Sequence, residues 1–407
     1  MSHSSKIFTT AVFVAALGYF VDIYDLLLFG IIRIPSLTDM GISKEMVKTV
    51  GEDILSWQMW GLLIGGIIWG VMGDKKGRLS VLFGSILLYS LANIANGLVQ
   101  TVLQYKLIRF VAGIGLAGEL GAGITLVAEL MAKEKRGIAT SLVAGIGLSG
   151  AVMAFVFKQH FHWRTCYFIG AGMGFVLLML RMSVFESSMY QKVKKEKMKR
   201  GDFLMFFNNA DRFTRYLLNI LIGLPTWLCI GILVTFSKEF GETMGIKEAI
   251  DPGKSIMYAY AAISAGDILI GLVSQYFKSR KTALYIYISI TLLFITLFFL
   301  PAFNNSAARM YWICAGIGFG TGYWAIFVTM AAEQFGTNLR ATAATTIPNM
   351  VRGMLAVAIL PLFKWLRLYT DYYHAGLITA VVIMSFSLVA IVLIKETFGK
   401  DLNFTEV

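Results

Sequence analysis

Apolar stretches of about twenty residues, separated by short polar segments, recur along the whole chain of 407 residues. A helix of that length crosses the ~30 Å hydrocarbon core of a bilayer. The apolar positions run continuously and do not alternate with polar ones, which favours helices over the strands of a membrane barrel. We predict an all-α membrane protein with twelve transmembrane helices, over residues 7–34, 53–73, 79–99, 102–129, 137–158, 164–185, 212–236, 254–276, 282–303, 308–334, 341–366 and 371–395.

The composition agrees with a protein that faces lipid. Hydrophobic residues make up 57% of the chain and charged residues 15%, whereas soluble domains carry about 25% charged residues. The three cysteines lie in apolar stretches without CxxC spacing, so we expect neither disulfides nor a metal site from them.

Three short segments of the first half return in the second half at nearly one offset. They are Ala112-Gly113-Ile114-Gly115 with Ala315-Gly316-Ile317-Gly318, Ala128-Glu129 with Ala332-Glu333, and Arg136 with Arg340, at offsets of 203 or 204 residues. We therefore predict two six-helix bundles, 1–185 and 212–407, joined by a cytoplasmic linker, 186–211. Parallel repeats of this kind are typical of transporters with a substrate site near the midplane.

Lys and Arg are distributed unevenly over the loops. If both termini lie in the cytoplasm, the inside segments contain roughly twice as many Lys and Arg residues as the outside loops, as the positive-inside rule requires. We expect a multi-pass protein of the inner membrane with both termini cytoplasmic. This placement also explains much of the net charge of +12, and argues against nucleic acid as a partner.

The first predicted helix carries two acidic residues about fifteen residues from its start, Asp22 and Asp25. Their i, i+3 spacing places both carboxylates on one face. Acids in the middle of a membrane cost several kcal/mol unless they are paired, wetted or protonated, so they are candidates for function. Desolvation and mutual repulsion favour protonation of at least one. The alternative is a shorter first helix, with both acids in an outer vestibule.

The fourth predicted helix carries Arg109 and Glu119 among several glycines, including Gly113 and Gly118. The glycines allow another helix to pack closely. Arg109 stays charged at any relevant pH, so it must find a carboxylate, a substrate anion or water.

In the second half, Asp267 and Arg352 are the intramembrane ionisable residues of the predicted eighth and eleventh helices. Arg352 either binds an anionic substrate group or pairs with Asp267. Aromatic residues such as Trp57, Trp60, Tyr323 and Trp324 either line a cavity or face lipid. The residues that we expect to contact substrate are Tyr24, Asp267, Tyr323, Trp324, Asn349 and Arg352.

The loop after the second predicted helix reads Gly70-Val-Met-Gly-Asp74-Lys75-Lys76-Gly77-Arg78-Leu79. It resembles the G-x-x-x-D-R/K-x-G-R-R/K motif of the major facilitator superfamily, with Leu79 in place of the last base. The segment with Glu129 and Arg136 resembles the A-E…R-G segment of sugar and metabolite carriers. The resemblance implies gating roles for Gly70, Asp74, Lys75, Gly77, Arg78, Glu129 and Arg136.

Two further segments are similar to metabolite:proton symporters, which are related to aromatic-acid and phosphate proton symporters. One is Asp22-Ile-Tyr24-Asp25; the other is Arg109 to Gly123, where Ala117 replaces one glycine of the family pattern and Glu119 stands where phosphate carriers have Asp. This resemblance implies import, with proton coupling through Asp22, Asp25, Arg109 and Glu119.

Other classes of function find little support. The four histidines lie at termini or in outside loops, and no Walker loop, zinc spacing or nucleophile motif is present, so we expect no enzyme, metal, cofactor or ATP-driven pump. We predict a monomeric secondary transporter, a symporter of protons with an organic acid, amino acid or betaine. A proton-independent facilitator or exchanger, or an exporter, remains the alternative; a membrane receptor or enzyme is a remote one.

Overall fold

The computed structural model describes residues 3–76, 78–119, 143–185, 203–336, 338–400 and 406. The first half contains α1 (His3–Asp39), α2 (Lys44–Lys76), α3 (Arg78–Leu98), α4 (Val102–Leu116), α7 (Gly150–His160) and α8 (Trp163–Phe185). The second half contains η1 (Phe203–Phe206), α9 (Ala210–Leu228), η2 (Cys229–Val234), α10 (Ser237–Thr243), α11 (Pro252–Phe277), α12 (Arg280–Phe298), α13 (Ala307–Thr321), α14 (Trp324–Glu333), α15 (Arg340–Met354), η3 (Leu355–Ile359), α16 (Leu360–Leu366) and α17 (Tyr372–Leu393).

Ten spans among the described residues are long and apolar enough to cross a membrane. The predicted fourth and fifth helices, 102–129 and 137–158, are described only in part. The all-α fold predicted from the apolar pattern is confirmed. The limits 1–185, 186–211 and 212–407 stay a prediction, because most of the linker lies outside the described residues.

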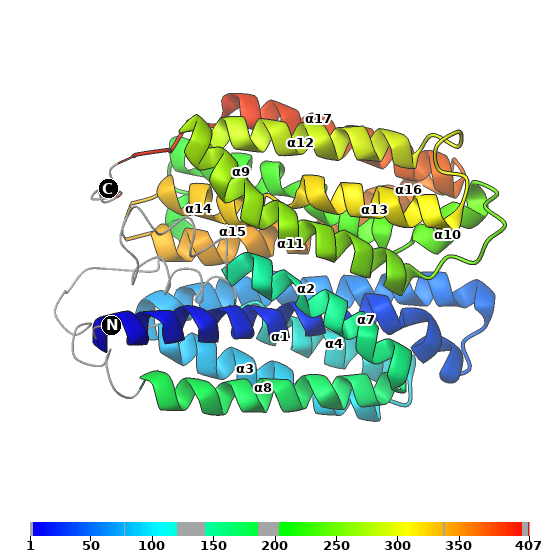
Figure 1. Ribbon diagram of the computed structural model, residues 1–407, viewed down its shortest axis with the longest axis horizontal. Coiled ribbons are helices and arrows are strands. Elements are labelled where there is room, and N and C mark those ends of the chain that lie inside the picture. The colour runs from blue at the N-terminus through cyan, green and yellow to red at the C-terminus, as the bar shows by residue number, and fades with distance from the viewer. Residues whose placement is uncertain are drawn as a thin grey trace.

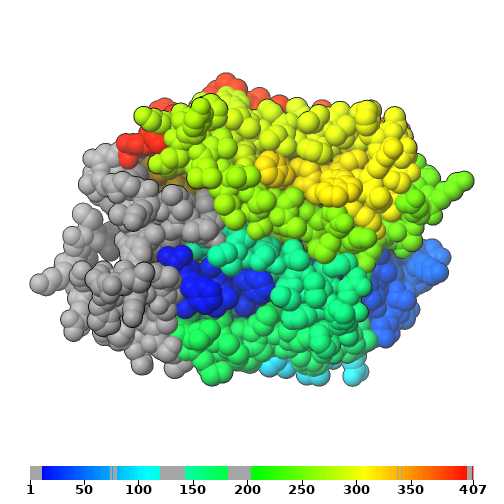
Figure 2. Space-filling model, in the orientation of Figure 1, coloured from blue at the N-terminus to red at the C-terminus, as the bar shows by residue number. Residues whose placement is uncertain are grey.

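The helices form two groups that lie one above the other in Figure 1, with α1 to α8 below and α9 to α17 above. α1 begins and α17 ends at the same end of the bundle, which we name the terminal end; the opposite end is the distal end. The groups meet mainly where α2 packs on α15 and α7 packs on α11. In Figure 2 side chains of both groups meet along a seam on the visible face.

The repeated glycines serve the same purpose in both halves. A Cβ on Gly113 of α4 would lie 2.2 Å from Gln58 O of α2, and one on Gly318 of α13 would lie 2.1 Å from Ala259 O of α11. Any larger residue would separate these backbones. The close helix approach predicted for the glycines of the fourth helix is therefore present.

Several helix boundaries differ from the predicted ones. α1 continues through Pro35 to Asp39, and α2 begins at Lys44 instead of 53. Three predicted second-half helices are interrupted. The predicted helix 212–236 has the π-helical turn η2 after Pro225, and the predicted helix 341–366 has the π-helical turn η3 after Pro348. The predicted helix 308–334 is broken between α13 and α14. Proline removes a helical hydrogen bond, which explains why irregular turns follow two of these positions.

Candidate functional site

The two acids of α1 lie inside the bundle. α1 runs over 37 residues, and the side chains of Asp22 and Asp25 are both 0% exposed. The alternative of a shorter first helix with the acids in an outer vestibule is therefore wrong. α1 packs against α2, α7 and α8 of its own half and against α11 of the other.

Asp25 is held entirely within the first half. Its Oδ1 lies 3.1 Å from Arg109 Nη1, and its backbone O accepts a hydrogen bond of 3.0 Å from Arg109 Nη2. Arg109 Nε donates to Gln58 Oε1 at 3.2 Å, and Gln58 in turn donates to Leu26 O at 2.9 Å. Three helices, α1, α2 and α4, thus enclose a fully buried ion pair whose guanidinium is well satisfied.

Tyrosines complete this side of the site. The Arg109 guanidinium lies 5.7 Å from the centre of the Tyr167 ring, and the hydroxyls of Tyr105 and Tyr167 are 2.7 Å apart. Tyr24 donates its hydroxyl to Cys166 O of α8 at 2.8 Å. Tyr24 therefore joins α1 to α8 here, and its predicted contact with substrate stays a prediction.

Asp22, in contrast, faces the second half. Its Oδ2 lies 4.0 Å from Arg352 Nη2 of α15, and both side chains are at most 1% exposed. Within the described part of the chain, neither Asp22 oxygen has a hydrogen-bond partner, and the same holds for Arg352 Nε and Nη1. A buried charge pair with this many free polar atoms is unusual, since such atoms are normally satisfied. The two charges attract each other across the boundary but leave donors and acceptors for a third group.

Asp267 does not pair with Arg352 in this structure. Its Oδ1 accepts a hydrogen bond of 2.8 Å from Ala325 N at the start of α14. Of the two alternatives left open by the sequence, the Asp267–Arg352 pair is not formed, and the carboxylate facing Arg352 is that of Asp22.

Of the remaining predicted substrate residues, Trp324 lies beside Arg352, while Tyr323 and Asn349 bond to backbone oxygens. The Trp324 ring centre is 5.8 Å from Arg352 Cζ, and Trp324 Nε1 has no hydrogen-bond partner among the described residues. Tyr323 donates its hydroxyl to Ile222 O at 2.9 Å. Asn349 donates to Ala117 O of the first half at 2.8 Å. Trp57 and Trp60 are 38% and 42% exposed on α2, which agrees with lipid-facing positions.

Glu119 forms a separate pair that the sequence did not suggest. Both of its oxygens accept from Arg181 of α8, with Oε2 at 2.9 Å from Nη1. The pair packs on Gly18 of α1, where a Cβ would collide with both side chains. Arg181 lies inside the predicted helix 164–185, and its place near the helix end gave no indication of a partner.

Ion pairs close the distal end between the two halves. They join Arg33 Nη1 to Glu239 Oε1 at 2.8 Å, Lys158 Nζ to Asp251 Oδ2 at 2.5 Å, Arg367 Nη1 to Glu52 Oε1 at 2.6 Å, and Lys364 Nζ to Asp53 Oδ1 at 2.9 Å. Arg33 and Glu52 are both 1% exposed. These residues lie in or near the predicted outside loops, where charges give no indication of pairing between positions 93 to 315 residues apart.

The predicted gating residues can be placed only in part. A Cβ on Gly70 would lie 3.0 Å from Thr346 Cγ2 of the other half. The side chains of Asp74, Lys75 and Arg78, together with Gly77, Glu129 and Arg136, lie outside the described residues, so their roles stay predictions.

The segment Gly271 to Lys281, at the end of α11 and the start of α12, corresponds in the second half to the motif Gly70 to Leu79. Arg280 Nη2 lies 3.2 Å from Glu333 Oε1, and Thr397 donates to Glu333 Oε2 at 2.7 Å. Partial burial of Glu396 opposes its ionisation. Hydrogen bonds from Ser279 and from backbone N–H groups that include those of α12 outweigh this and lower the pKa of Glu396 to about 2. The end of the chain after α17 is thereby attached to α12.

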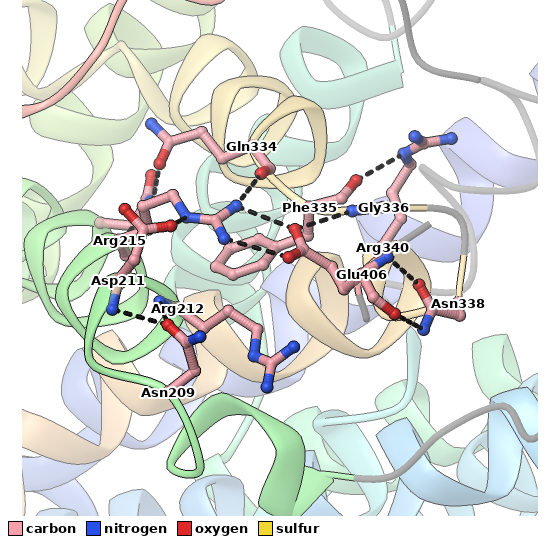
Figure 3. A network of polar contacts seen from close by, with 11 residues as sticks. Asn209, Asp211, Arg212, Arg215, Gln334, Phe335, Gly336, Asn338, Arg340 and Glu406 are labelled. Carbon is pink, nitrogen blue, oxygen red and sulfur yellow. Dashed lines mark hydrogen bonds and ion pairs between the residues drawn. The ribbon is translucent and has the colours of Figure 1, made fainter. Parts of the chain in front are cut away.

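A second network lies at the terminal end of the second half (Figure 3). Glu406 accepts from Arg215 of α9 at 2.9 and 3.1 Å, and from Gly336 N at 3.3 Å. Burial acts against ionisation of Glu406, yet these bonds lower its pKa below the usual value. Glu406 also exchanges backbone and side-chain hydrogen bonds with Asn338, so it links α9 to the segment between α14 and α15.

The distal ion pairs yield a prediction about opening. Ile256 of α11 is 0% exposed and contacts Gly30 of α1 near that end. In an Ile256→Cys background, Arg33→Gln or Glu52→Gln should speed labelling by a membrane-impermeant maleimide about fivefold, because ~1 kcal/mol shifts a two-state ratio by that factor. The native cysteines are buried and give little background.

The matched control is Lys238→Gln, which removes an exposed pair with Glu242 inside α10 at 3.8 Å. It should leave the labelling rate unchanged. Equal rates in the parent, Arg33→Gln and Glu52→Gln proteins would show that these pairs do not keep the distal end closed.

Comparisons with known proteins agree with the arrangement of the helices. The family model described as Major Facilitator Superfamily matches residues 9–361. The chain is 25% identical over 353 residues to the putative niacin/nicotinamide transporter NiaP of Bacillus subtilis (strain 168), covering 82% of each chain. It is 24% identical over 394 residues to the sialic acid transporter NanX of Escherichia coli (strain K12), covering 94% of this chain and 93% of that one.

A solved structure shares the fold. The proton:xylose symporter XylE, bound to 6-bromo-6-deoxy-D-glucose, superimposes with a TM-score of 0.74 over 98% of both chains at 14% identity. The predicted family is thus confirmed, and these relatives are transporters and not enzymes. The chain belongs to the major facilitator superfamily and is a multi-pass membrane transporter of small metabolites.

Proposed function

We propose that the protein is a proton-coupled symporter that imports a small organic acid through alternating access. The observation that carries this proposal is the buried Asp22–Arg352 pair, which joins the two halves at 4.0 Å while most of its polar atoms have no partner in the described part of the chain. Such a pair is strong enough to favour one arrangement of the halves and open enough to accept a ligand.

The free donors around Arg352 favour a carboxylate as ligand. Arg352 Nε and Nη1 and Trp324 Nε1 all lack partners among the described residues. A guanidinium binds carboxylates through two parallel hydrogen bonds, and an indole N–H donates only. The Trp324 ring offers a face for a planar substrate. Among the compounds for which the relatives NiaP and NanX are named, niacin and sialic acid carry a carboxylate and nicotinamide does not.

The proton follows from charge balance. When a substrate carboxylate takes Arg352, Asp22 loses its countercharge in a fully buried place. A lone carboxylate there is costly, so Asp22 binds a proton from the outside solution as the substrate enters. When the site opens to the cytoplasm, the substrate leaves, the proton leaves Asp22, and Asp22 and Arg352 pair again. One anion and one proton move together.

Asp25 and Glu119 have different roles in this scheme. Each is bound to a guanidinium of its own half, Arg109 or Arg181, and neither pair crosses the boundary between the halves. They stabilise the first half around α1. Of the acids considered for proton transfer, Asp22 is therefore the one that responds to the second half.

We propose that both termini are cytoplasmic in the inner membrane, so the distal end faces outward. The distal ion pairs then represent the closed outer gate. The motif around Gly70 to Arg78, with Glu129 and Arg136, would form the inner gate, in keeping with the family resemblance.

A zwitterion, such as an amino acid or betaine, is the second candidate. It is favoured by the two Asp22 oxygens, which have no hydrogen-bond partner among the described residues and could bind a cationic group while Arg352 binds the carboxylate. In that case Asp22 would need no proton, and the protein would act as a facilitator or exchanger.

The test is transport by the purified protein in liposomes, with nicotinate, sialic acid and a panel of amino acids and betaines. We expect accumulation of an organic acid when the outside is acidic. Asp22→Asn should abolish gradient-driven accumulation but keep counterflow, because a neutral side chain still allows anion exchange. Arg352→Gln should raise the KM at least about tenfold, as for the loss of a charged contact.

Asp39→Asn is the matched control, because Asp39 lies on the same helix but its side chain is 47% exposed. It should transport as the parent protein does. Accumulation that ignores the pH gradient, or that persists in Asp22→Asn, would refute proton coupling through Asp22.

A further inference from the structure

The tenth predicted helix, 308–334, is interrupted near Arg352. The carboxylate of Asp267 on α11 accepts a hydrogen bond from the backbone at this break. α13 ends at Thr321 and α14 begins at Trp324, so Gly322 and Tyr323 belong to neither helix. The first N–H groups of a helix have no partner inside it. Asp267 Oδ1 accepts a hydrogen bond from one of them, Ala325 N, at 2.8 Å.

Backbone contacts determine where Asp267 lies. A Cβ on Gly322 would lie 2.9 Å from Gly266 Cα and 3.0 Å from Asp267 N, so α11 touches the break directly. Tyr287 of α12 donates its hydroxyl to Gly266 O at 2.8 Å. The acid is thus attached to a rigid contact between α11, α12 and the end of α13, and it can serve as a fixed point for α14.

No cation accompanies this acid in the described part of the chain. Asp267 is 0% exposed, forms no ion pair there, and its Oδ2 has no hydrogen-bond partner. Burying a carboxylate without a cation is unfavourable. Its hydrogen bond with Ala325 N lies next to Trp324, whose ring lies over Arg352.

We propose that Asp267 is a positioning residue for the substrate site. By accepting from Ala325 N it fixes the start of α14, and thereby holds the Trp324 ring beside Arg352. The effect of Asp267 on substrate binding rests on the proposed function. The structural link from Asp267 to Trp324 is independent of that function. This role requires a hydrogen-bond acceptor and no charge, which separates it from proton transfer.

Asparagine supplies the acceptor without the charge, so the test compares Asp267→Asn with Asp267→Ala in the full chain. We expect Asp267→Asn to bind nicotinate, or whichever acid the parent protein binds, within about twofold of the parent and to keep proton-driven accumulation. Asp267→Ala should raise the Kd about tenfold, the change that corresponds to ~1.4 kcal/mol. In a Trp324→Phe background, the same substitution should cause no further loss, because contacts in one chain of interactions are not additive.

Two measurements keep this inference separate from the proposed function. Asp267→Ala, and not Asp267→Asn, should lower the apparent melting temperature in detergent, whatever the substrate is. Thr379→Ala is the control: it deletes a buried hydroxyl of α17 that donates to Ala375 O of the same helix at 2.7 Å, and it should leave the Kd unchanged.

Failure of Asp267→Ala to fold beside a folded Asp267→Asn would also support a positioning role. Three results would overturn it: loss of driven accumulation in Asp267→Asn, equal melting temperatures of the parent and Asp267→Ala, or a full additional loss of affinity in the Trp324→Phe background. A parent protein that binds no acid would refute the proposed substrate and leave the melting comparison to decide the role of Asp267.

Discussion

The attraction between Asp22 of α1 and Arg352 of α15 is the interaction on which the account depends. It is the buried contact between opposite charges at the middle of the bundle that crosses from one half to the other, within the part of the chain that the structure describes. Its strength in a medium of low dielectric is large. Any ligand or proton that changes the charge of either partner therefore changes how the two halves attract each other, which is the requirement for coupling binding to movement.

The other buried ion pairs differ from this pair in how they are bonded and in which half of the molecule their partners lie. Asp25 with Arg109, and Glu119 with Arg181, are bound within the first half by several hydrogen bonds. They stay satisfied in any arrangement that keeps that half rigid. The distal pairs also cross between the halves, but each joins a buried residue, Arg33 or Glu52, to a partner that is 12% or 22% exposed, so water reaches one member of each pair. The site thus combines a rigid inner framework with contacts that can separate.

Much of this could be predicted from the sequence. The apolar stretches predicted the helical fold, the repeated glycines predicted close packing, and Asp22, Asp25 and Arg109 stood out because charges inside membrane helices are rare. The partners could not be predicted: Arg181 and Glu52 lie near predicted helix ends, where charges are common, and the break at Gly322 has no proline to indicate it. Buried polar residues of α3, such as Asn93 and Asn96, also escaped notice, because single amides in an apolar helix carry no periodic signal.

Proton uptake on substrate binding tests the central claim most directly. An organic acid that the protein binds, such as nicotinate, is added to the purified protein in weakly buffered detergent solution. The change in pH is followed with an indicator dye. The account predicts uptake of about one proton for each acid bound, and none in Asp22→Asn even where that variant still binds the acid. Binding without proton uptake by the parent protein, or undiminished uptake by Asp22→Asn, would contradict it.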